Sequence, residues 1–185
     1  MKAYHLSKFD HHQAGDFMVC KQRTVVVGGD LALFADEFHQ YWPRQLSNFG
    51  YDCTQGIHGS NSRIAIIEMF LETIRSKGFP DKPSRFQAFF ASDSIDQAKR
   101  WHSRLLKRSN PSASRSLWLV ESDEGILLDA GWLDYFDINN VSWPLWTFIA
   151  TQYWKGVPFK ASPWPELLLP SFRFIEQLDS LDSTI

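Results

Sequence analysis

The segment Tyr4-His5-Leu6-Ser7 places an imidazole and a hydroxyl where both could act on one ligand. In an extended strand, His5 and Ser7 point to the same face. Such a pair can hydrogen-bond the hydroxyl groups of a ribose or the amide of a ring substituent. A surface histidine on an edge strand would show the same pattern, so this segment alone leaves both interpretations open.

A second segment runs from Arg85 through Phe89 and Phe90 to Ser92, and it predicts a strand that leads into a capped helix. One phenylalanine ring could stack on a bound heteroaromatic base while the other joins the core, and core packing alone would also explain both rings. Arg85 could neutralise a pyrophosphate, because a guanidinium donates in parallel to phosphate oxygens. An ordinary surface ion pair is the alternative role of Arg85.

The third segment is Trp164-Pro165-Glu166, followed by an apolar strand. A carboxylate is costly to bury there, so Glu166 must be exposed, paired or used in chemistry. Pro165 and the following strand would fix the direction of its side chain, as catalysis requires. An exposed glutamate at a strand end is the simpler alternative.

Other polar groups do not indicate a second chemistry. His11 and His12 with Asp16 could be metal ligands, but adjacent histidines on an extended chain point to opposite sides, so we expect a polar loop and no metal. The sequence has no nucleophile elbow, reactive-cysteine signature or glycine-rich phosphate loop. Cys20 and Cys53 fit reduced residues of a core or its boundary.

The elements that must position these groups follow from hydrophobic periodicity and turn residues. Strands are predicted at residues 3–7, 17–20, 24–30, 85–92, 117–122, 125–132, 166–170 and 172–177. Helices are predicted at 31–42, 61–78, 94–105 and 142–154, and a loop at 48–61. Residues 123–125 would turn a hairpin, and Gly78 and Gly156 would end helices. This order predicts a mixed α+β fold with mainly antiparallel pairing and about three to four helices.

Composition limits the function classes. The 185 residues suit a single domain over 1–178 with a polar tail at 179–185, and 44% apolar content excludes a disordered chain. The net charge of −2 produces no single-sign field that would attract a polyanion or an anionic membrane. The basic loop 107–115 could still touch the phosphates of a nucleic acid, or it could be simply solvated. We expect a cytoplasmic protein without a membrane partner, because no long apolar run or signal core occurs.

Taken in order, the three segments resemble the ADP-ribosyltransferases of the diphtheria-toxin and poly-ADP-ribose-polymerase type. More closely, residues 3 to 176 are similar to a bacterial family that begins with a His-x-Ser strand and Gly-Asp, here His5-Leu6-Ser7 and Gly15-Asp16. Pro-Ser-Arg at residues 83–85 and Tyr-Trp-x-Gly at residues 153–156 complete the likeness. The resemblance implies a split antiparallel sheet.

The resemblance also implies roles for individual residues. His5 would hold the adenosine ribose of NAD, and Glu166 would bond the nicotinamide ribose. Phe89 or Phe90 stands where those enzymes present tyrosine or serine, so the hydroxyl of that position could come only from Ser92 or Ser84. The predicted site therefore has Glu166 as its catalytic residue and a group of NAD-binding residues: His5, Ser7, Arg85, Phe89, Phe90 and Ser92.

The expected activity is NAD-dependent transfer of ADP-ribose to a cellular macromolecule, protein or nucleic acid, with NAD as co-substrate. A toxin or conflict-system effector of this kind would have a neutralising antitoxin or immunity protein as a partner. An NAD glycohydrolase and a non-enzymatic module that binds a nucleotide or a partner protein are the alternatives. The enzymatic hypothesis requires His5 and Glu166 to converge on one crevice sized for a dinucleotide.

Overall fold

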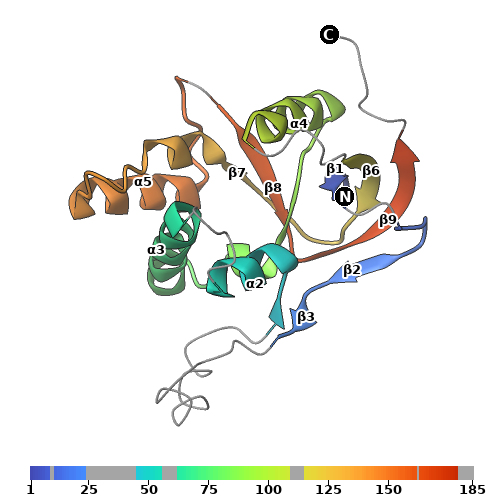
Figure 1. Ribbon diagram of the computed structural model, residues 1–185, viewed down its shortest axis with the longest axis horizontal. Helices are drawn as coiled ribbons and strands as arrows, with labels where there is room; N and C mark the ends of the chain where they lie inside the picture. Colours follow the sequence, from blue (N-terminus) through green and yellow to red (C-terminus); the bar gives the residue numbers. More distant parts are fainter. Residues whose placement is uncertain (9–10, 24–44, 56–61, 109–114, 162, 179–185) are drawn as a thin grey trace.

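The computed structural model describes residues 1–8, 11–23, 45–55, 62–108, 115–161 and 163–178, which form a mixed α+β fold (Figure 1). Every strand pair among these residues is antiparallel. The structure thus confirms the α+β class and the antiparallel pairing that the sequence pattern predicts. Within the same residues, no helix combines the length and the apolar character needed to cross a membrane.

The larger sheet has four strands in the order β1-β6-β9-β2. Its members are β1 (Lys2–Ser7), β6 (Ser116–Glu121), β9 (Ser171–Leu178) and β2 (Phe17–Val19). The strand β1 lies at one edge and pairs along its whole length with β6, so that His5 is opposite Trp118. The predicted strands at both ends of the chain are therefore neighbours in one sheet.

A second sheet has three strands in the order β5-β8-β7. They are β5 (Phe89–Ala91), β8 (Pro165–Leu169) and β7 (Ile126–Asp129). A single bridge joins the two sheets, in which the backbones of Tyr4 and Ser92 exchange two hydrogen bonds of 2.8 Å. The segments around His5, Phe90 and Glu166 thus lie on three successive strands, β1, β5 and β8. A short ladder of β3 (Lys21–Gln22) and β4 (Gln45–Leu46) lies apart from both sheets.

The described α-helices are α2 (Asn48–Gln55), α3 (Ser62–Gly78), α4 (Ile95–Arg108) and α5 (Trp143–Lys155), with 3-10 turns η2 (Arg85–Gln87) and η3 (Ala130–Tyr135). Figure 1 shows α3 and α5 together on the side of the molecule away from the four-stranded sheet. Their apolar faces pack on the three-stranded sheet in a cluster that includes Leu71, Tyr153, Trp154 and Leu168. We call this cluster the helical core.

A second cluster fills the space between the two sheets. It includes Ala3 from β1, Leu167 and Leu169 from β8, and Phe172 and Phe174 from β9. We call it the inter-sheet core. Successive residues of a strand point to opposite faces, so β8 contributes alternate leucines to the two cores.

Two predicted local structures are wrong. Residues 48–55 form α2 instead of a loop, because Ser47 Oγ accepts a bond from Gly50 N and Gly50 packs against Phe86, where a Cβ atom would lie only 2.2 Å from the carbonyl oxygen. The hairpin at 123–125 does not form, since β6 and β7 belong to different sheets. Ser122 N donates to Met1 O and Ser122 Oγ donates to Ser171 O, which keeps the end of β6 in the four-stranded sheet.

Two further expectations are corrected in detail. The predicted strand 85–92 is a strand only from Phe89, because residues 85–87 form η2, capped by Ser84. Gly78 ends α3 without a left-handed conformation, whereas Gly156 does adopt one after α5, with a φ of 72°. The predicted strand 24–30 and helix 31–42 lie outside the described residues.

Candidate functional site

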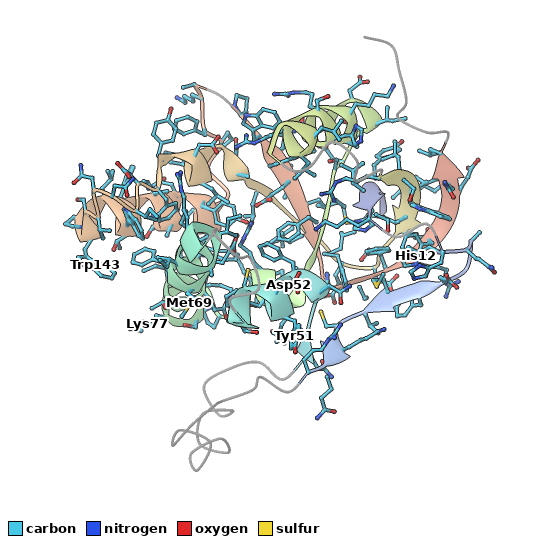
Figure 2. All side chains as sticks on the ribbon, in the orientation of Figure 1. His12, Tyr51, Asp52, Met69, Lys77 and Trp143 are labelled. Atoms are coloured by element: carbon cyan, nitrogen blue, oxygen red, sulfur yellow. The ribbon has the colours of Figure 1, made fainter. Side chains whose placement is uncertain are left out.

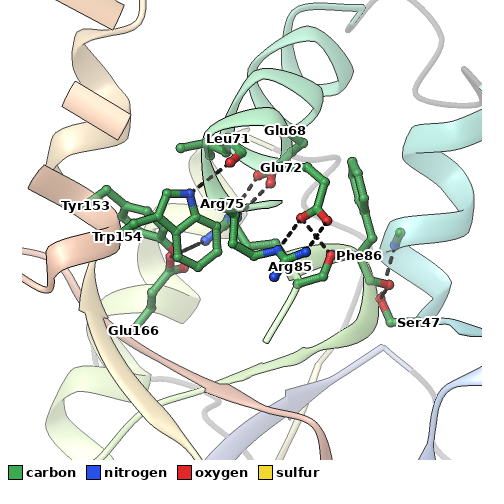
Figure 3. A network of polar contacts seen from close by, with 12 residues as sticks. Ser47, Glu68, Leu71, Glu72, Arg75, Arg85, Phe86, Tyr153, Trp154 and Glu166 are labelled. Atoms are coloured by element: carbon green, nitrogen blue, oxygen red, sulfur yellow. Dashed lines mark hydrogen bonds and ion pairs between the residues drawn. The ribbon is translucent and has the colours of Figure 1, made fainter. Parts of the chain in front are cut away.

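Arg85 lies at the centre of a buried polar network (Figure 3). The turn η2 directs it inward, because Ser84 Oγ accepts a bond from Phe86 N and donates one of 2.9 Å to Glu72 on α3. The Arg85 side chain is only 7% exposed. A guanidinium cannot give up its proton in a protein, so this charge must be compensated inside the fold.

Two carboxylates from different elements compensate Arg85. Glu68 of α3 accepts from Nε at 2.7 Å and from Nη2 at 2.9 Å, in a bidentate pair. Glu166 of β8 accepts from Nη1 through Oε1, and the same oxygen accepts the Tyr153 hydroxyl of α5 at 2.7 Å. Because three separate elements converge on one guanidinium, the direction of the Glu166 carboxylate is fixed (Figure 3).

Burial and charge act against each other in this network. Burial raises the pKa of Glu68, although the Arg85 charge opposes the change. Burial alone would lower the pKa of Arg85, but the Glu166 and Glu68 charges raise it well above its usual value. Burial raises the pKa of Tyr153 well above its usual value, with the Arg85 charge opposing and the Glu166 charge adding to the change, so its hydroxyl remains a donor to Glu166.

Phe90 extends the network toward β5. The Arg85 guanidinium carbon lies 4.7 Å from the centre of the Phe90 ring and 5.3 Å from that of Tyr153. A cation over an aromatic face is attracted by the ring quadrupole. Of the residues predicted for the site, the structure therefore brings together Arg85, Phe90 and Glu166 on the helical side of the three-stranded sheet.

His5 reaches the same strand from the other side. Its Nδ1 donates to Phe90 O at 2.8 Å, and its ring lies 4.8 Å from that of Phe172 in the inter-sheet core. Burial lowers the pKa of His5 to about 4, although the bond to Phe90 opposes this. His5 is therefore neutral near pH 7. Ser7 is buried at the end of β1, on the face of the strand that His5 shares.

Phe89 faces a small pocket beside the inter-sheet core. The pocket has a volume of about 160 Å³, and its lining includes His11, His12, Met18, Lys21, Asn48 and Phe89. The Phe89 ring lies 5.4 Å from Phe172, and the His12 ring stacks on Phe174 at 4.3 Å. Lys21 and Asn48 place a cationic and an amide group beside the half-buried Phe89 ring.

The alternation of strand residues separates the predicted site into two parts. Phe90 and Glu166 face the helical core, whereas Phe89 and His5 face the inter-sheet core. Neither His5 nor Glu166 lines the pocket at Phe89. Ser92 is buried, and its backbone holds β1 against β5. The expected shared crevice of His5 and Glu166 is not seen: the two residues meet only through the Phe90 carbonyl and ring.

Sequence reasoning missed Glu68 and Tyr153. Glu68 lies among the buried positions Ile67 and Leu71 of α3, so a carboxylate within an apolar stripe was the available signal. Tyr153 belongs to the Tyr-Trp-x-Gly segment, but that segment alone assigns it no partner. Within the described part of the chain, no group of three or more His, Cys, Asp and Glu residues could hold a metal.

Comparison with protein families adds one match. A family model described as "Protein of unknown function (DUF2441)" matches residues 3–180. A search of curated proteins found no match.

Proposed function

The chain belongs to the DUF2441 family, and we propose that it is an NAD-dependent ADP-ribosyltransferase acting on a cellular macromolecule. Because His5 faces the inter-sheet core and shares no crevice with Glu166, the NAD contact expected of His5 is not part of this proposal. One observation carries the proposal: the three segments that resemble those enzymes lie on the successive strands β1, β5 and β8. Segments far apart in the sequence become spatial neighbours, as the bond between His5 and Phe90 illustrates with its separation of 85 residues. Within the described residues a single bridge, between β1 and β5, joins the two sheets, and this arrangement also supports the split sheet that the resemblance implies.

Glu166 is the proposed catalytic residue. Cleavage of the bond between nicotinamide nitrogen and ribose C1′ sends the bonding electron pair to nicotinamide and builds positive charge on the sugar. A fixed carboxylate stabilises that charge more than it stabilises the ground state. The acceptor nucleophile then bonds to C1′ and loses its proton, which completes the transfer.

Arg85 takes a positioning role in this proposal. Its guanidinium already donates to Glu68, Tyr153 and Glu166, so it replaces the expected pyrophosphate contact with an internal one. The bidentate pair with Glu68 compensates the Arg85 charge. Arg85 and Tyr153 together hold the Glu166 carboxylate in its fixed direction. The pocket at Phe89, with Lys21 and Asn48, lies on the other face of the three-stranded sheet from Glu166 and is not part of the proposed catalytic site.

The test is release of nicotinamide from labelled NAD in the presence of a cell lysate, with the label followed onto macromolecules. Glu166→Gln should lower the release by roughly 10²- to 10³-fold, the scale seen when one transition-state contact is removed, and leave NAD affinity measurable. Glu176→Gln, which changes an exposed glutamate of β9 in the same way, should retain activity. Full activity of Glu166→Gln would remove the proposal.

The burial of Glu166 supports a second candidate, a module that binds a nucleotide without reacting. Glu166 is 5% exposed and does not reach the pocket at Phe89. In that case the wild-type protein binds NAD and releases no nicotinamide. Free ADP-ribose without a labelled macromolecule would instead identify an NAD glycohydrolase. A toxin or conflict-system role with a neutralising partner protein rests on the transferase outcome.

A further inference from the structure

The helix α4 concentrates positive charge in a chain whose net charge is −2. Its described side chains include Lys99, Arg100 and Arg104, against Asp96 as an acidic residue. Lys99 and Arg100 are exposed. The helix therefore presents a local field that the net charge of the whole chain conceals.

Two arginines of α4 stack on aromatic rings. The guanidinium carbons of Arg100 and Arg104 lie 4.8 Å and 4.3 Å from the centre of the Trp164 ring. Trp101 lies 5.3 Å from Trp164 and 5.3 Å from the Arg104 guanidinium. We call Lys99, Arg100, Trp101, Arg104 and Trp164 the α4 surface.

Hydrogen bonds hold this arrangement in place. Arg100 donates to Gln97 Oε1 at 3.0 Å and to Pro163 O at 3.4 Å, and Arg104 pairs with Asp134 of η3. Side chains ordered in advance lose less conformational entropy when a ligand binds. The exposed Arg100 keeps its guanidinium carbon over the Trp164 ring.

The α4 surface is attached directly to the start of β8. Trp101 Nε1 and Gln97 Nε2 both donate to Pro165 O, at 2.9 Å and 3.3 Å. Pro165 is the residue before Glu166. Figure 1 shows α4 alongside β8, on a different side of the molecule from α2 and α3.

We propose that the α4 surface binds single-stranded nucleic acid. Lys99 and Arg100 supply cations for the phosphates, and the arginine and tryptophan planes supply stacking surfaces for unpaired bases. An acidic peptide would use the charges but not the stacked planes, so the combination favours a nucleic acid. Binding itself is independent of NAD chemistry; the added assignment of the bound strand as the acceptor rests on the proposed function.

The test measures fluorescence anisotropy of a labelled single-stranded oligonucleotide of about 20 bases, as DNA and as RNA, with the full chain and no NAD. We expect saturable binding that weakens between about 50 mM and about 200 mM salt, because phosphate contacts release counterions. The double variant Lys99→Gln/Arg100→Gln should bind at least about tenfold more weakly. The slope of log affinity against log salt concentration should become smaller by about 1.4, at about 0.7 for each lost phosphate contact. Lys77→Gln, which removes an exposed lysine at the far end of α3, should change neither (Figure 2).

A conservative variant separates charge from stacking. Arg100→Lys keeps the charge and removes the planar guanidinium, so we expect a several-fold loss of affinity with an unchanged salt slope.

The proposal is overturned if no saturable binding occurs at the lowest salt, if the double variant binds like the wild type, or if polyglutamate competes as well as the oligonucleotide. Because NAD is absent, each of these results is independent of transferase activity. Far-UV circular dichroism of each variant confirms that it is folded.

Discussion

At the scale of single residues, Arg85 determines whether two buried carboxylates can keep their charge. Glu68 and Glu166 are both about 5% exposed, and both accept hydrogen bonds from the same guanidinium. Removing one partner of a buried ion pair leaves the other charge uncompensated, which costs far more than losing an exposed pair. The network is therefore more sensitive to the loss of Arg85 than to the loss of either carboxylate.

Replacing Arg85 with leucine should lower the free energy of unfolding by about 3–5 kcal/mol near pH 8. Without the guanidinium, nothing opposes the burial that raises the pKa of Glu68, so the folded variant binds a proton that the unfolded chain releases. Its loss of stability should therefore be smaller at pH 5 than at pH 8. Urea unfolding at the two pH values measures this. Arg173→Leu, on the exposed face of β9, should show little loss at either pH.

The buried His5 leads us to expect that the folded protein loses stability at acid pH. Burial lowers the pKa of His5 from 6.5 to about 4, so the folded protein holds the imidazole neutral where the unfolded chain takes up a proton. Above pH 6.5 His5 is neutral in both states and does not lower the free energy of unfolding. As the pH falls from 6.5 toward 4, the unfolded chain takes up a proton that the folded protein does not, so the free energy of unfolding decreases. The lost stability is roughly 3 kcal/mol at most.

Urea unfolding between pH 7 and pH 4 tests the role of His5. His5→Asn retains a donor that can reach the Phe90 carbonyl but does not titrate, so its stability should fall less over this range than that of the wild type. The same change at the exposed His11 should leave the wild-type decrease in place. An equal decrease in His5→Asn and the wild type would show that another group carries the acid sensitivity.

At the scale of elements, a glycine ends both α3 and α5, but the two glycines have different backbone conformations. Gly156 ends α5 with a φ of 72°, and its N–H donates to Tyr153 O. Gly78 ends α3 without a positive φ and without any heavy atom within 4 Å of the position of a Cβ. A side chain is strained at the first position and unhindered at the second.

Alanine at these two glycines should therefore have opposite effects. Gly156→Ala should lower the free energy of unfolding by about 1 kcal/mol, because a left-handed conformation disfavours a Cβ atom. Gly78→Ala should raise it by about 0.5–1 kcal/mol, since alanine restricts the unfolded chain and favours helix. Thermal unfolding of both variants measures the difference. A stabilised Gly156→Ala would contradict the proposed strain.

At the scale of the whole molecule, β8 connects the two hydrophobic cores. Leu168 packs in the helical core, and Leu167 packs in the inter-sheet core on the opposite face. Detachment of β8 would therefore expose apolar side chains of both cores to water. The single domain predicted for residues 1–178 should therefore unfold as one unit.

Cooperative unfolding gives a direct test of that expectation. Leu167→Ala and Leu168→Ala should each cost about 2–5 kcal/mol, and each should shift the whole transition. Tryptophan fluorescence and far-UV circular dichroism should report the same urea midpoint, because Trp118 lies in one core and Trp154 in the other. Two separate midpoints would divide the chain into independently folding parts.

The sequence by itself determined the features that depend on neighbouring residues. Hydrophobic spacing and capping predicted α3, α4 and α5, and short strand-like apolar segments predicted β1, β8 and β9, since these patterns act within a few residues. The cost of burying a carboxylate also predicted that Glu166, if not exposed, would be paired or used. The structure shows that Glu166 is paired.

The tertiary structure alone decided which residues meet. The partners of Arg85 at Tyr153 and Glu166 are 68 and 81 residues away in the sequence, and no local pattern encodes such contacts. It also decided that residues 48–55 are helical and that β6 and β7 separate into two sheets. Long-range packing outweighs local preference at these places, because the burial of Cys53 and the pairing of β7 with β8 stabilise arrangements that the local sequence does not favour.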